Sequence, residues 1–305
     1  MIRQAIAFAA FWLASTLGQA AEVAVLKSGD SPAWRPAIEA LRRSATGHTI
    51  TEYDLKDDKA EALRVLAELK PKAPILVAMG PLAAQSARES TPDLPMIFCM
   101  IQDPGQLGLL GGVNTLGVAF SVPVKNQLAA FRAVNPRGVR IGVIFGSDAT
   151  ARLVQEAMLA SHVLRLNLIE KRVASEKDVP ATLRGMLKGP EAVDALWLPP
   201  DPMLLGDAAR RFLLSETLKA GKPLYAFSAA LVAEGALVSN GPDVASVGEQ
   251  VAELVNRVAA GERGGRGGRG ELLVPRGELV INKRMAERLK LEIPADALAQ
   301  ASRVF

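Results

Sequence analysis

Short apolar runs alternate with segments of helical periodicity from residue 21 onward. In the first half of the chain the apolar runs occupy residues 22–26, 48–55, 74–79 and 95–101. Between two of them, Ala62, Val65, Leu66 and Leu69 recur at the spacing of one helix face. This alternation predicts strand–helix–strand units that form a parallel sheet.

A second set of apolar runs predicts a second sheet. It occupies residues 140–145, 166–173, 193–198 and 223–227, with a helical segment between each pair. Runs such as 75–78 and 141–144 are apolar at nearly every position, which is typical of strands covered by helices on both faces. The sequence therefore predicts an α/β fold with two doubly wound parallel-sheet lobes.

The turn-rich segment 133–138 is the expected break between the lobes. We expect lobe 1 at residues 21–136 and lobe 2 at residues 137–240. A helix at about 243–262, in which Val251, Leu254, Val255 and Val258 recur with helical periodicity, is expected to return to lobe 1. The segment at about 271–305 is expected to complete lobe 2.

The first twenty residues have the pattern of a secretory signal peptide. Arg3 precedes an uncharged apolar stretch from residue 5 to 17, which is short for a membrane span, and Gly18-Gln19-Ala20 supplies small residues for cleavage after Ala20. The alternative is a buried N-terminal helix. No cysteine follows the apolar stretch, so lipid anchoring at that point is excluded. We expect a protein that is exported to the periplasm.

Composition narrows the classes of function. Of 305 residues, 49% are hydrophobic and 22% are charged, which is typical of a globular protein. The formal charge of +4 is small for this length and gives no reason to expect nucleic-acid binding. Cys99 is the single cysteine, so an intramolecular disulfide and a cysteine-rich metal site are both excluded. We expect neither a metal nor a cofactor.

Residues 264–270 form a Gly-Arg segment that matches the spacing of a dinucleotide-binding loop at Gly265, Gly267 and Gly270. The match fails in its context, because that loop needs a preceding strand and a following helix, whereas a helix precedes it here. An RNA-binding Arg-Gly element is the other alternative. Three arginines, Arg263 just before the segment and Arg266 and Arg269 within it, favour a solvated, flexible loop in an exported chain.

Ligands of open α/β sheets bind at the carboxyl ends of the strands, so the residues after each run are the candidate site. In lobe 1, Trp34 offers either a stacking surface or a packed rim aromatic. Gly80-Pro81 opens a helix whose free N–H groups can receive a carboxylate, or it is an ordinary connection. Gln102 and Asp103 follow the next run, and Asp103 either accepts a ligand amine or fixes a turn.

In lobe 2 the candidates follow three further runs. Ser147 opens a helix, where it is most simply an N-cap. Asp201 is held between prolines and serves no obvious cap, which favours a ligand contact. Phe227 ends its run, and Ser228 follows it directly. These residues complete the expected ligand-binding set.

The chain has few of the residues and motifs that catalysis requires. Cys99 lies inside an apolar run, where a buried, unreactive thiol is expected. His48 and His162 are the complete supply of histidine, and no nucleophile elbow, phosphate-binding loop or metal motif accompanies them. We therefore expect a binding protein without catalytic residues.

The order of several segments resembles a known family. The most telling are Pro95-Met96-Ile97-Phe98 with Asp103-Pro104, Leu116-Gly117-Val118 leading to Gln127-Leu128, Arg140-Ile141-Gly142-Val143, Val193-Asp194-Ala195-Leu196-Trp197 with Asp201, Pro223-Leu224-Tyr225-Ala226-Phe227-Ser228, and Leu279-Val280-Ile281-Asn282. From about residue 22 to 294 the chain resembles the bacterial ABC transporter substrate-binding proteins of the group that takes up aromatic or branched amino acids.

This resemblance implies a type I periplasmic binding protein, with two lobes joined by three crossing strands and closing on a small ligand. It also implies a ligand carboxylate at Gly80-Pro81 and polar contacts near Asp103, Asp201 and Ser228. The sequence departs from the family in three places. Gly80-Pro81-Leu82 stands where relatives usually carry Gly-Thr, and Pro202 stands where relatives often have Asn. The Gly-Arg segment from Gly264 replaces a more ordinary connection.

The function that follows is capture of a small organic, amino-acid-like ligand by a periplasmic protein, expected to be a monomer, for an ABC permease in the inner membrane. The alternative is a sensory module that uses the same closure to signal to a membrane kinase or cyclase. An exported enzyme on the same fold is a third possibility, and the residue inventory disfavours it.

Overall fold

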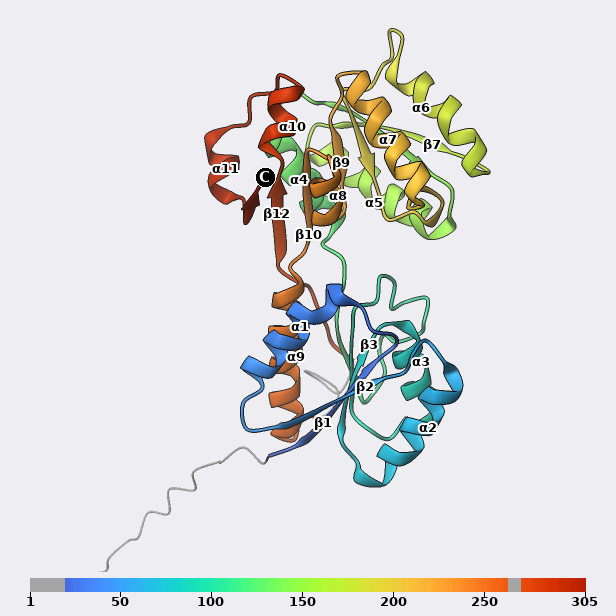
Figure 1. Ribbon diagram of the computed structural model, residues 1–305, viewed down its shortest axis with the longest axis vertical. Coiled ribbons are helices and arrows are strands. Elements are labelled where there is room, and N and C mark those ends of the chain that lie inside the picture. The colour runs from blue at the N-terminus through green and yellow to red at the C-terminus, as the bar shows by residue number, and fades with distance from the viewer. Residues whose placement is uncertain (1–19, 263–269) are drawn as a thin grey trace, which may run out of the picture.

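The computed structural model describes residues 20–262 and 270–305, which fold into two α/β lobes (Figure 1). The predicted signal peptide falls almost wholly outside these residues, and so does the Gly-Arg segment apart from Gly270. The two-lobed α/β fold predicted from the sequence is confirmed. Among the described residues, no helix combines the length and the apolar character needed to cross a membrane.

Lobe 1 is built on a six-stranded sheet with the order β11-β5-β4-β3-β1-β2. All of the pairings between neighbours in this sheet are parallel. The strands are β1 (Glu22–Lys27), β2 (Thr49–Asp54), β3 (Ile75–Met79), β4 (Met96–Cys99), β5 (Thr115–Val118) and β11 (Leu272–Leu273). The helices of this lobe are η1 (Pro32–Trp34), α1 (Arg35–Ser44), α2 (Lys59–Leu69), η2 (Lys70–Lys72), α3 (Pro81–Ser90) and α9 (Val244–Ala259).

Apolar side chains cover both faces of the lobe 1 sheet, as its uninterrupted apolar strands require. Helices α1 and α9 pack on one face, and α2 and α3 pack on the other. Helices α1 and α9 can approach closely because Gly248 has no Cβ. A Cβ at this position would overlap the backbone carbonyl of Ala37. Helix α9 therefore returns to lobe 1 after the chain has passed through lobe 2.

Lobe 2 is built on a seven-stranded sheet with the order β13-β12-β10-β9-β8-β6-β7, in which β10 and β12 form the antiparallel pair. Its strands are β6 (Arg140–Phe145), β7 (Asn167–Arg172), β8 (Ala195–Leu198), β9 (Leu224–Ala226), β10 (Val238–Pro242), β12 (Gly277–Ile281) and β13 (Arg303–Val304). Its helices are α4 (Val124–Val134), α5 (Asp148–Val163), η3 (Glu176–Asp178), α6 (Val179–Leu187), η4 (Pro202–Leu204), α7 (Asp207–Lys219), α8 (Ala229–Glu234), α10 (Lys283–Arg288) and α11 (Ala295–Gln300).

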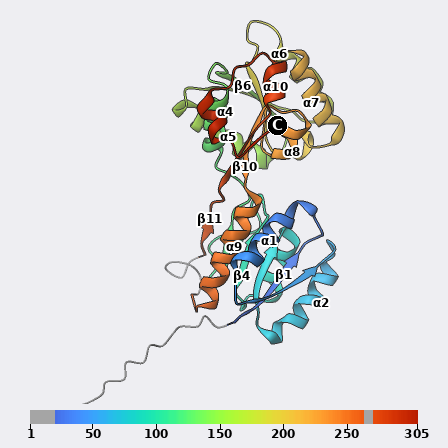
Figure 2. The same ribbon diagram turned by 60° about the vertical axis from the view of Figure 1, so that its left-hand side comes forward.

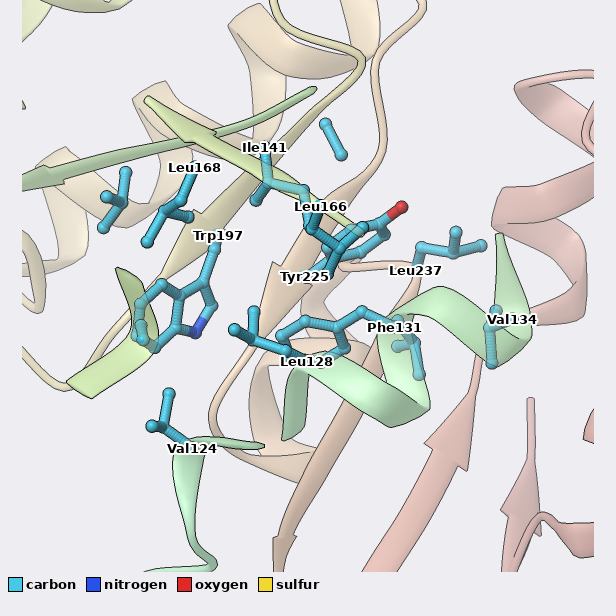
Figure 3. Close-up of a cluster of buried hydrophobic side chains, with 14 of the residues drawn as sticks. Val124, Leu128, Phe131, Val134, Ile141, Leu166, Leu168, Trp197, Tyr225 and Leu237 are labelled. Atoms are coloured by element: carbon cyan, nitrogen blue, oxygen red, sulfur yellow. The ribbon is translucent and has the colours of Figure 1, made fainter. Parts of the chain in front are cut away.

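One face of the lobe 2 sheet carries a core with large aromatic side chains (Figure 3). Trp197 and Tyr225 are fully buried, and the Tyr225 ring stacks on Phe131 with their centroids 4.8 Å apart. The Tyr225 hydroxyl accepts a hydrogen bond of 2.8 Å from Asn135 Nδ2, which satisfies the polar tip of a buried ring. Helices α6, α7 and α8 cover the opposite face.

Helix α4 lies in lobe 2, although the expected boundary at residue 136 assigned it to lobe 1. Its buried residues Val124, Leu128 and Phe131 pack in the lobe 2 core, and the helix contacts α5, β10 and α11. The chain therefore passes from lobe 1 to lobe 2 at residues 119–123, before the break predicted from turn residues. The position of the boundary depends on where the apolar face of α4 is buried. A prediction based on Pro and Gly residues carries no information about that burial.

In the part of the chain that the structure describes, three segments join the lobes: residues 119–123, the connection at Asp243, and residues 274–276. Amide side chains hold two of them, since Gln127 Nε2 donates to Val122 O at 2.8 Å and Gln250 Nε2 donates to Val274 O at 3.0 Å. The amide of Asp243 donates to Arg276 O at 2.9 Å and ties the second segment to the third. Both views show the lobes meeting through these segments (Figure 2).

Candidate functional site

The strands that lead into the crossing segments fix which ends of the two sheets face each other. Strands β5 and β11 leave lobe 1 at their carboxyl ends, and β10 leaves lobe 2 at its carboxyl end. Their neighbours β4 and β9 run parallel to them. The carboxyl ends of the parallel strands in both lobes are therefore directed toward the other lobe, where ligands of open α/β sheets bind.

Every residue predicted for the site follows such a carboxyl end. In lobe 1, Trp34 follows β1, Gly80 and Pro81 follow β3, and Gln102 and Asp103 follow β4. The lobe 2 residues are Ser147 after β6, Asp201 after β8, and Phe227 and Ser228 after β9. The topology thus directs the complete predicted set toward the facing ends of the two lobes.

Gly80 and Trp34 are neighbours at the lobe 1 end. Gly80 has φ 90° and ψ 169°, a conformation that is essentially restricted to glycine. A Cβ at this position would lie 2.7 Å from Ser28 Oγ and 2.9 Å from Trp34 Cη2. Trp34 is half-buried and packs against the lobe 1 core. Its edge therefore borders the start of α3 while part of the ring faces solvent.

The start of α3 offers fewer hydrogen-bond donors than the sequence suggests. Pro81 has no N–H, and the amide of Ala83 donates to the buried Ser28 hydroxyl at 3.0 Å. Ala84 N donates to Gly80 O at 3.2 Å. Among the first-turn N–H groups of α3, that of Leu82 is the one without a hydrogen bond in the described part of the chain. A ligand carboxylate at Gly80-Pro81 would thus meet a single main-chain donor.

Asp103 holds a turn and also reaches the other lobe. Its Oδ1 accepts a hydrogen bond of 3.1 Å from Gln106 N, the turn-fixing role that was one of its two alternatives. Its Oδ2 accepts a hydrogen bond of 3.2 Å from Arg152 Nη2 on α5 of lobe 2. Gln102 beside it is exposed. Asp103 therefore stands at the point where a charged side chain of lobe 2 reaches lobe 1.

Asp201 is a cap, and the expectation that it serves none is wrong. Its Oδ1 accepts a hydrogen bond from Met203 N at 3.0 Å as the N-cap of η4. Its Oδ2 accepts hydrogen bonds from Gly146 N and Ser147 N, each at 3.0 Å. The side chain is fully buried. Asp201 thus ties the β8–η4 turn to the start of α5, and its carboxylate is engaged by the protein itself.

The pKa of Asp201 reflects this environment. Burial on its own raises the pKa of a carboxyl group, because it disfavours the charged form. The amide donors of Ser147 and Gly146, the Thr150 hydroxyl and the Met203 amide stabilise the carboxylate more strongly, and the pKa lies below the ordinary value. The folded protein therefore keeps a buried negative charge at the start of α5.

The remaining lobe 2 candidates differ in how many contacts their side chains make within the protein. Ser147 is the N-cap of α5, since its Oγ accepts a hydrogen bond of 3.1 Å from Thr150 N. Phe227 is half-buried and packs against the lobe 2 core. Ser228 precedes α8, but its side chain makes no capping hydrogen bond. The Ser228 hydroxyl therefore keeps its hydrogen-bonding capacity for other groups.

Two residues at the facing ends were missed by sequence reasoning. Ser28 directly follows β1, and its hydroxyl is revealed as the cap of α3 by the tertiary contact with Ala83. Arg152 lies within α5, one turn after the helix start, where an arginine carries no recognisable signal. In both residues the function depends on a partner 49 or more positions away in the chain.

Two cavities lie at the opposite, amino ends of the sheets. One of about 580 Å³ is bordered by α7, α8 and α10 of lobe 2, and one of about 400 Å³ lies beside the starts of β3, β4 and β5 in lobe 1. Neither contains a residue of the predicted set. In the described part of the chain, no group of three or more His, Cys, Asp or Glu side chains is placed to hold a metal ion.

Solved structures share this architecture. A Streptococcus pneumoniae structure described as an ABC domain in complex with L-Trp is 23% identical, with a TM-score of 0.67 over 94% of this chain and 100% of its own. The ligand-free, open structure of a substrate-binding protein with adhesive properties from Clostridium difficile is 16% identical, with a TM-score of 0.80 over 93% of this chain and 99% of its own.

Sequence comparison identifies the family. A tyrosine-binding protein of Clostridioides difficile (strain R20291) is 24% identical over 199 residues, which cover 63% of this chain and 56% of that protein. The match thus spans little more than half of the relative. The family model for ABC transporter substrate binding proteins matches residues 37–305. The chain belongs to the family of ABC transporter substrate-binding proteins, a family of binding proteins and not of enzymes.

Proposed function

We propose that this chain is the substrate-binding component of an ABC transporter and captures a small, amino-acid-like ligand between its two lobes. The observation that carries the proposal is the orientation of the sheets. Both present the carboxyl ends of their parallel strands toward the other lobe, and three crossing segments connect the lobes within the described residues. Ligand contacts from both lobes then favour a closed arrangement.

The arrangement of the lobes supports an open, ligand-free state. The chain matches the open structure from Clostridium difficile with a TM-score of 0.80 and the L-Trp complex with a TM-score of 0.67. Sequence identity is lower for the open structure, at 16%, than for the L-Trp complex, at 23%. Sequence identity therefore does not account for the better fit, and we infer a lobe arrangement nearer to that of the open structure.

An aromatic amino acid is the ligand class that we favour. The curated relative is named a tyrosine-binding protein, and one solved relative contains L-Trp. In this chain, Trp34 is half-buried beside the start of α3, and Phe227 is half-buried at the facing end of lobe 2. Two partly exposed aromatic rings, one in each lobe, suit stacking on an aromatic side chain.

Export and a membrane partner complete the proposal. Residues 1–20 direct the chain to the periplasm and are removed after Ala20, so the processed chain begins at Ala21. In the periplasm the closed, ligand-loaded form is recognised by an ABC permease of the inner membrane. Binding and release require no chemical change in the ligand, in agreement with the absence of a catalytic motif from the sequence.

The test is a thermal-shift screen of the processed chain against the standard amino acids, nucleosides and organic acids. A ligand that binds the folded state alone stabilises it by about 2.7 kcal/mol at 100 times its dissociation constant. We expect aromatic amino acids to give the largest rise in melting temperature. Small-angle scattering in the same solutions should show a decrease in the radius of gyration as the lobes close.

Two results would contradict the proposal. Equal melting temperatures with every amino acid would remove the amino-acid-like ligand class. A rise in melting temperature without a change in scattering would remove capture between closing lobes. Cell fractionation tests the export step separately, because the proposal requires the processed chain in the periplasmic fraction.

A further inference from the structure

One ion pair joins the facing ends of the two lobes. Arg152 Nη2 on α5 of lobe 2 lies 3.2 Å from Asp103 Oδ2, in the connection between β4 and β5 of lobe 1. Arg172, the neighbouring arginine of lobe 2, pairs instead with Asp148 of its own lobe at 2.5 Å. Among the ion pairs of the described residues, the Arg152–Asp103 pair is the one that bridges these ends.

The exposure of this pair makes it exchangeable. The Arg152 and Asp103 side chains are 57% and 43% exposed. Pairs of this kind contribute little to stability, because water solvates both charges nearly as well as they solvate each other. Separating Arg152 from Asp103 therefore costs little when another pair of opposite charges takes their places.

The start of α3 has too few free N–H donors to bind a ligand carboxylate by itself. The other first-turn amides of α3 donate to the Ser28 hydroxyl and to Gly80 O. In the described part of the chain, the N–H of Leu82 is the first-turn donor of α3 that has no hydrogen bond. One amide is a weak receptor for a carboxylate, which prefers several donors or a guanidinium group. Arg152, at the facing ends of the lobes, already binds a carboxylate, namely that of Asp103.

We infer that a zwitterionic ligand splits this ion pair. Arg152 transfers from Asp103 to the ligand carboxylate, and Asp103 takes the ligand ammonium group. The two protein charges keep opposite partners throughout, so the exchange leaves no unpaired charge as closure removes water from the site. Arg152 is thus a specificity-determining residue for ligands that carry both charges. This inference rests on the proposed function.

The test uses isothermal titration calorimetry with the processed chain. The probes are L-tryptophan, tryptamine, which lacks the carboxylate, and indole-3-propionate, which lacks the ammonium group. We expect Arg152→Gln to weaken L-tryptophan binding about 10- to 100-fold, the range for loss of a charge-assisted hydrogen bond. Arg152→Lys should fall between the wild type and Arg152→Gln, because it keeps the charge without the planar fork.

The probes with one charge separate the two roles. Asp103→Asn should weaken L-tryptophan but not indole-3-propionate, and Arg152→Gln should not weaken tryptamine. In the wild type, a probe with one charge leaves one partner of the ion pair without an opposite charge, and each of these variants removes that cost. Arg172→Gln is the matched control, since it removes an equal charge from the same lobe without breaking the bridge. We expect its L-tryptophan affinity to stay at the wild-type value. Melting temperatures without ligand check that each variant is folded.

The outcomes distinguish this inference from the proposed function. If the wild type binds L-tryptophan and Arg152→Gln binds it equally well, the inference is wrong and the proposed function stands. Wild-type binding of tryptamine as tight as that of L-tryptophan would have the same consequence. If L-tryptophan does not bind, the same series is run with the amino acid that gives the largest shift in the screen. If no amino acid binds, both fail together.

Discussion

The two helix starts at the facing ends of the lobes are held in different ways. In lobe 1, the start of α3 is capped by a neutral hydroxyl, that of Ser28, beside a glycine that contacts Trp34. In lobe 2, the start of α5 is held by the buried carboxylate of Asp201 together with the Ser147 cap. Lobe 1 thus relies on close packing and a neutral cap, and lobe 2 relies on a buried charge.

This comparison changes where recognition of a ligand is expected. A helix start with free N–H groups is a ready site for an anion. At the start of α3 the protein itself takes most donors, since Ala83 N donates to Ser28 Oγ and Ala84 N donates to Gly80 O. At the start of α5, Asp201 takes the amides of Gly146 and Ser147, and Ser147 takes that of Thr150. Recognition at the lobe 1 end must then rely on side chains, and the two lobes should respond differently to substitution and to acid.

Asp201→Ala should produce the largest effect, and it should fall on lobe 2. The substitution leaves the amides of Gly146, Ser147 and Met203 without an acceptor. Unsatisfied buried donors cost about 1–3 kcal/mol each, so we expect the free energy of unfolding to fall by about 4 kcal/mol. Guanidinium unfolding followed by Trp197 fluorescence measures this, because Trp197 lies in the lobe 2 core.

The control for this prediction is the other tryptophan. The processed chain retains Trp34 and Trp197, one in each lobe, so replacing either with Phe gives a probe of a single lobe. Asp201→Ala in the Trp197→Phe background should leave the Trp34 transition in place. A Trp34 transition that moves as far as the Trp197 transition would mean that the lobes unfold as one unit, and the proposed division of roles would fail.

Gly80→Ala should give a smaller effect, on lobe 1. The position has φ 90°, and a Cβ there would lie 2.7 Å from Ser28 Oγ. Strain and overpacking each cost about 1–3 kcal/mol, so we expect a loss of about 3 kcal/mol, measured by Trp34 fluorescence. Gly47→Ala is the matched control, since Gly47 has φ 87° with no atom within 4 Å. Equal losses in both variants would show that packing at Gly80 contributes nothing.

Much of the fold could be predicted from the sequence because continuous apolar runs identify buried parallel strands. The eight runs predicted as strands coincide with strands of the two sheets, β3 and β6 among them. Strands β5 and β10 were not predicted, and both lead into crossing segments. β5 is only four residues long, and β10 contains Gly241 and Pro242, so neither gives the signal of an apolar run.

The positions of the candidate residues in the fold could be predicted, but their contacts could not. Strand ends locate Gly80, Asp103 and Asp201 correctly at the facing ends of the lobes, because the topology fixes where strand ends lie. Which donors remain free depends on tertiary partners, as the Ser28 cap of α3 shows. The same holds for Asp201, whose amide donors come from Gly146 and Ser147 more than fifty positions away in the chain.

The smallest effect that we predict is a dependence of lobe 2 stability on acid. The pKa of Asp201 is lowered in the folded state, because its amide donors outweigh burial, which acts to raise it. A lowered pKa means that the unfolded chain binds a proton more readily, with an ordinary Asp value of about 3.9. The stabilisation is therefore complete well above pH 4 or so and is lost as the pH falls through the folded pKa.

Protonation costs less than Asp201→Ala because it leaves the oxygen atoms in place as hydrogen-bond acceptors. The measurement is the free energy of unfolding against pH, followed by Trp197, for the wild type and for Asp201→Asn, which cannot titrate. One proton contributes a slope of at most about 1.4 kcal/mol per pH unit, and this part of the slope should be missing in Asp201→Asn. The Trp34 transition should show the same pH dependence in both proteins. Identical acid slopes at Trp197 would mean that the buried charge does not distinguish lobe 2 from lobe 1.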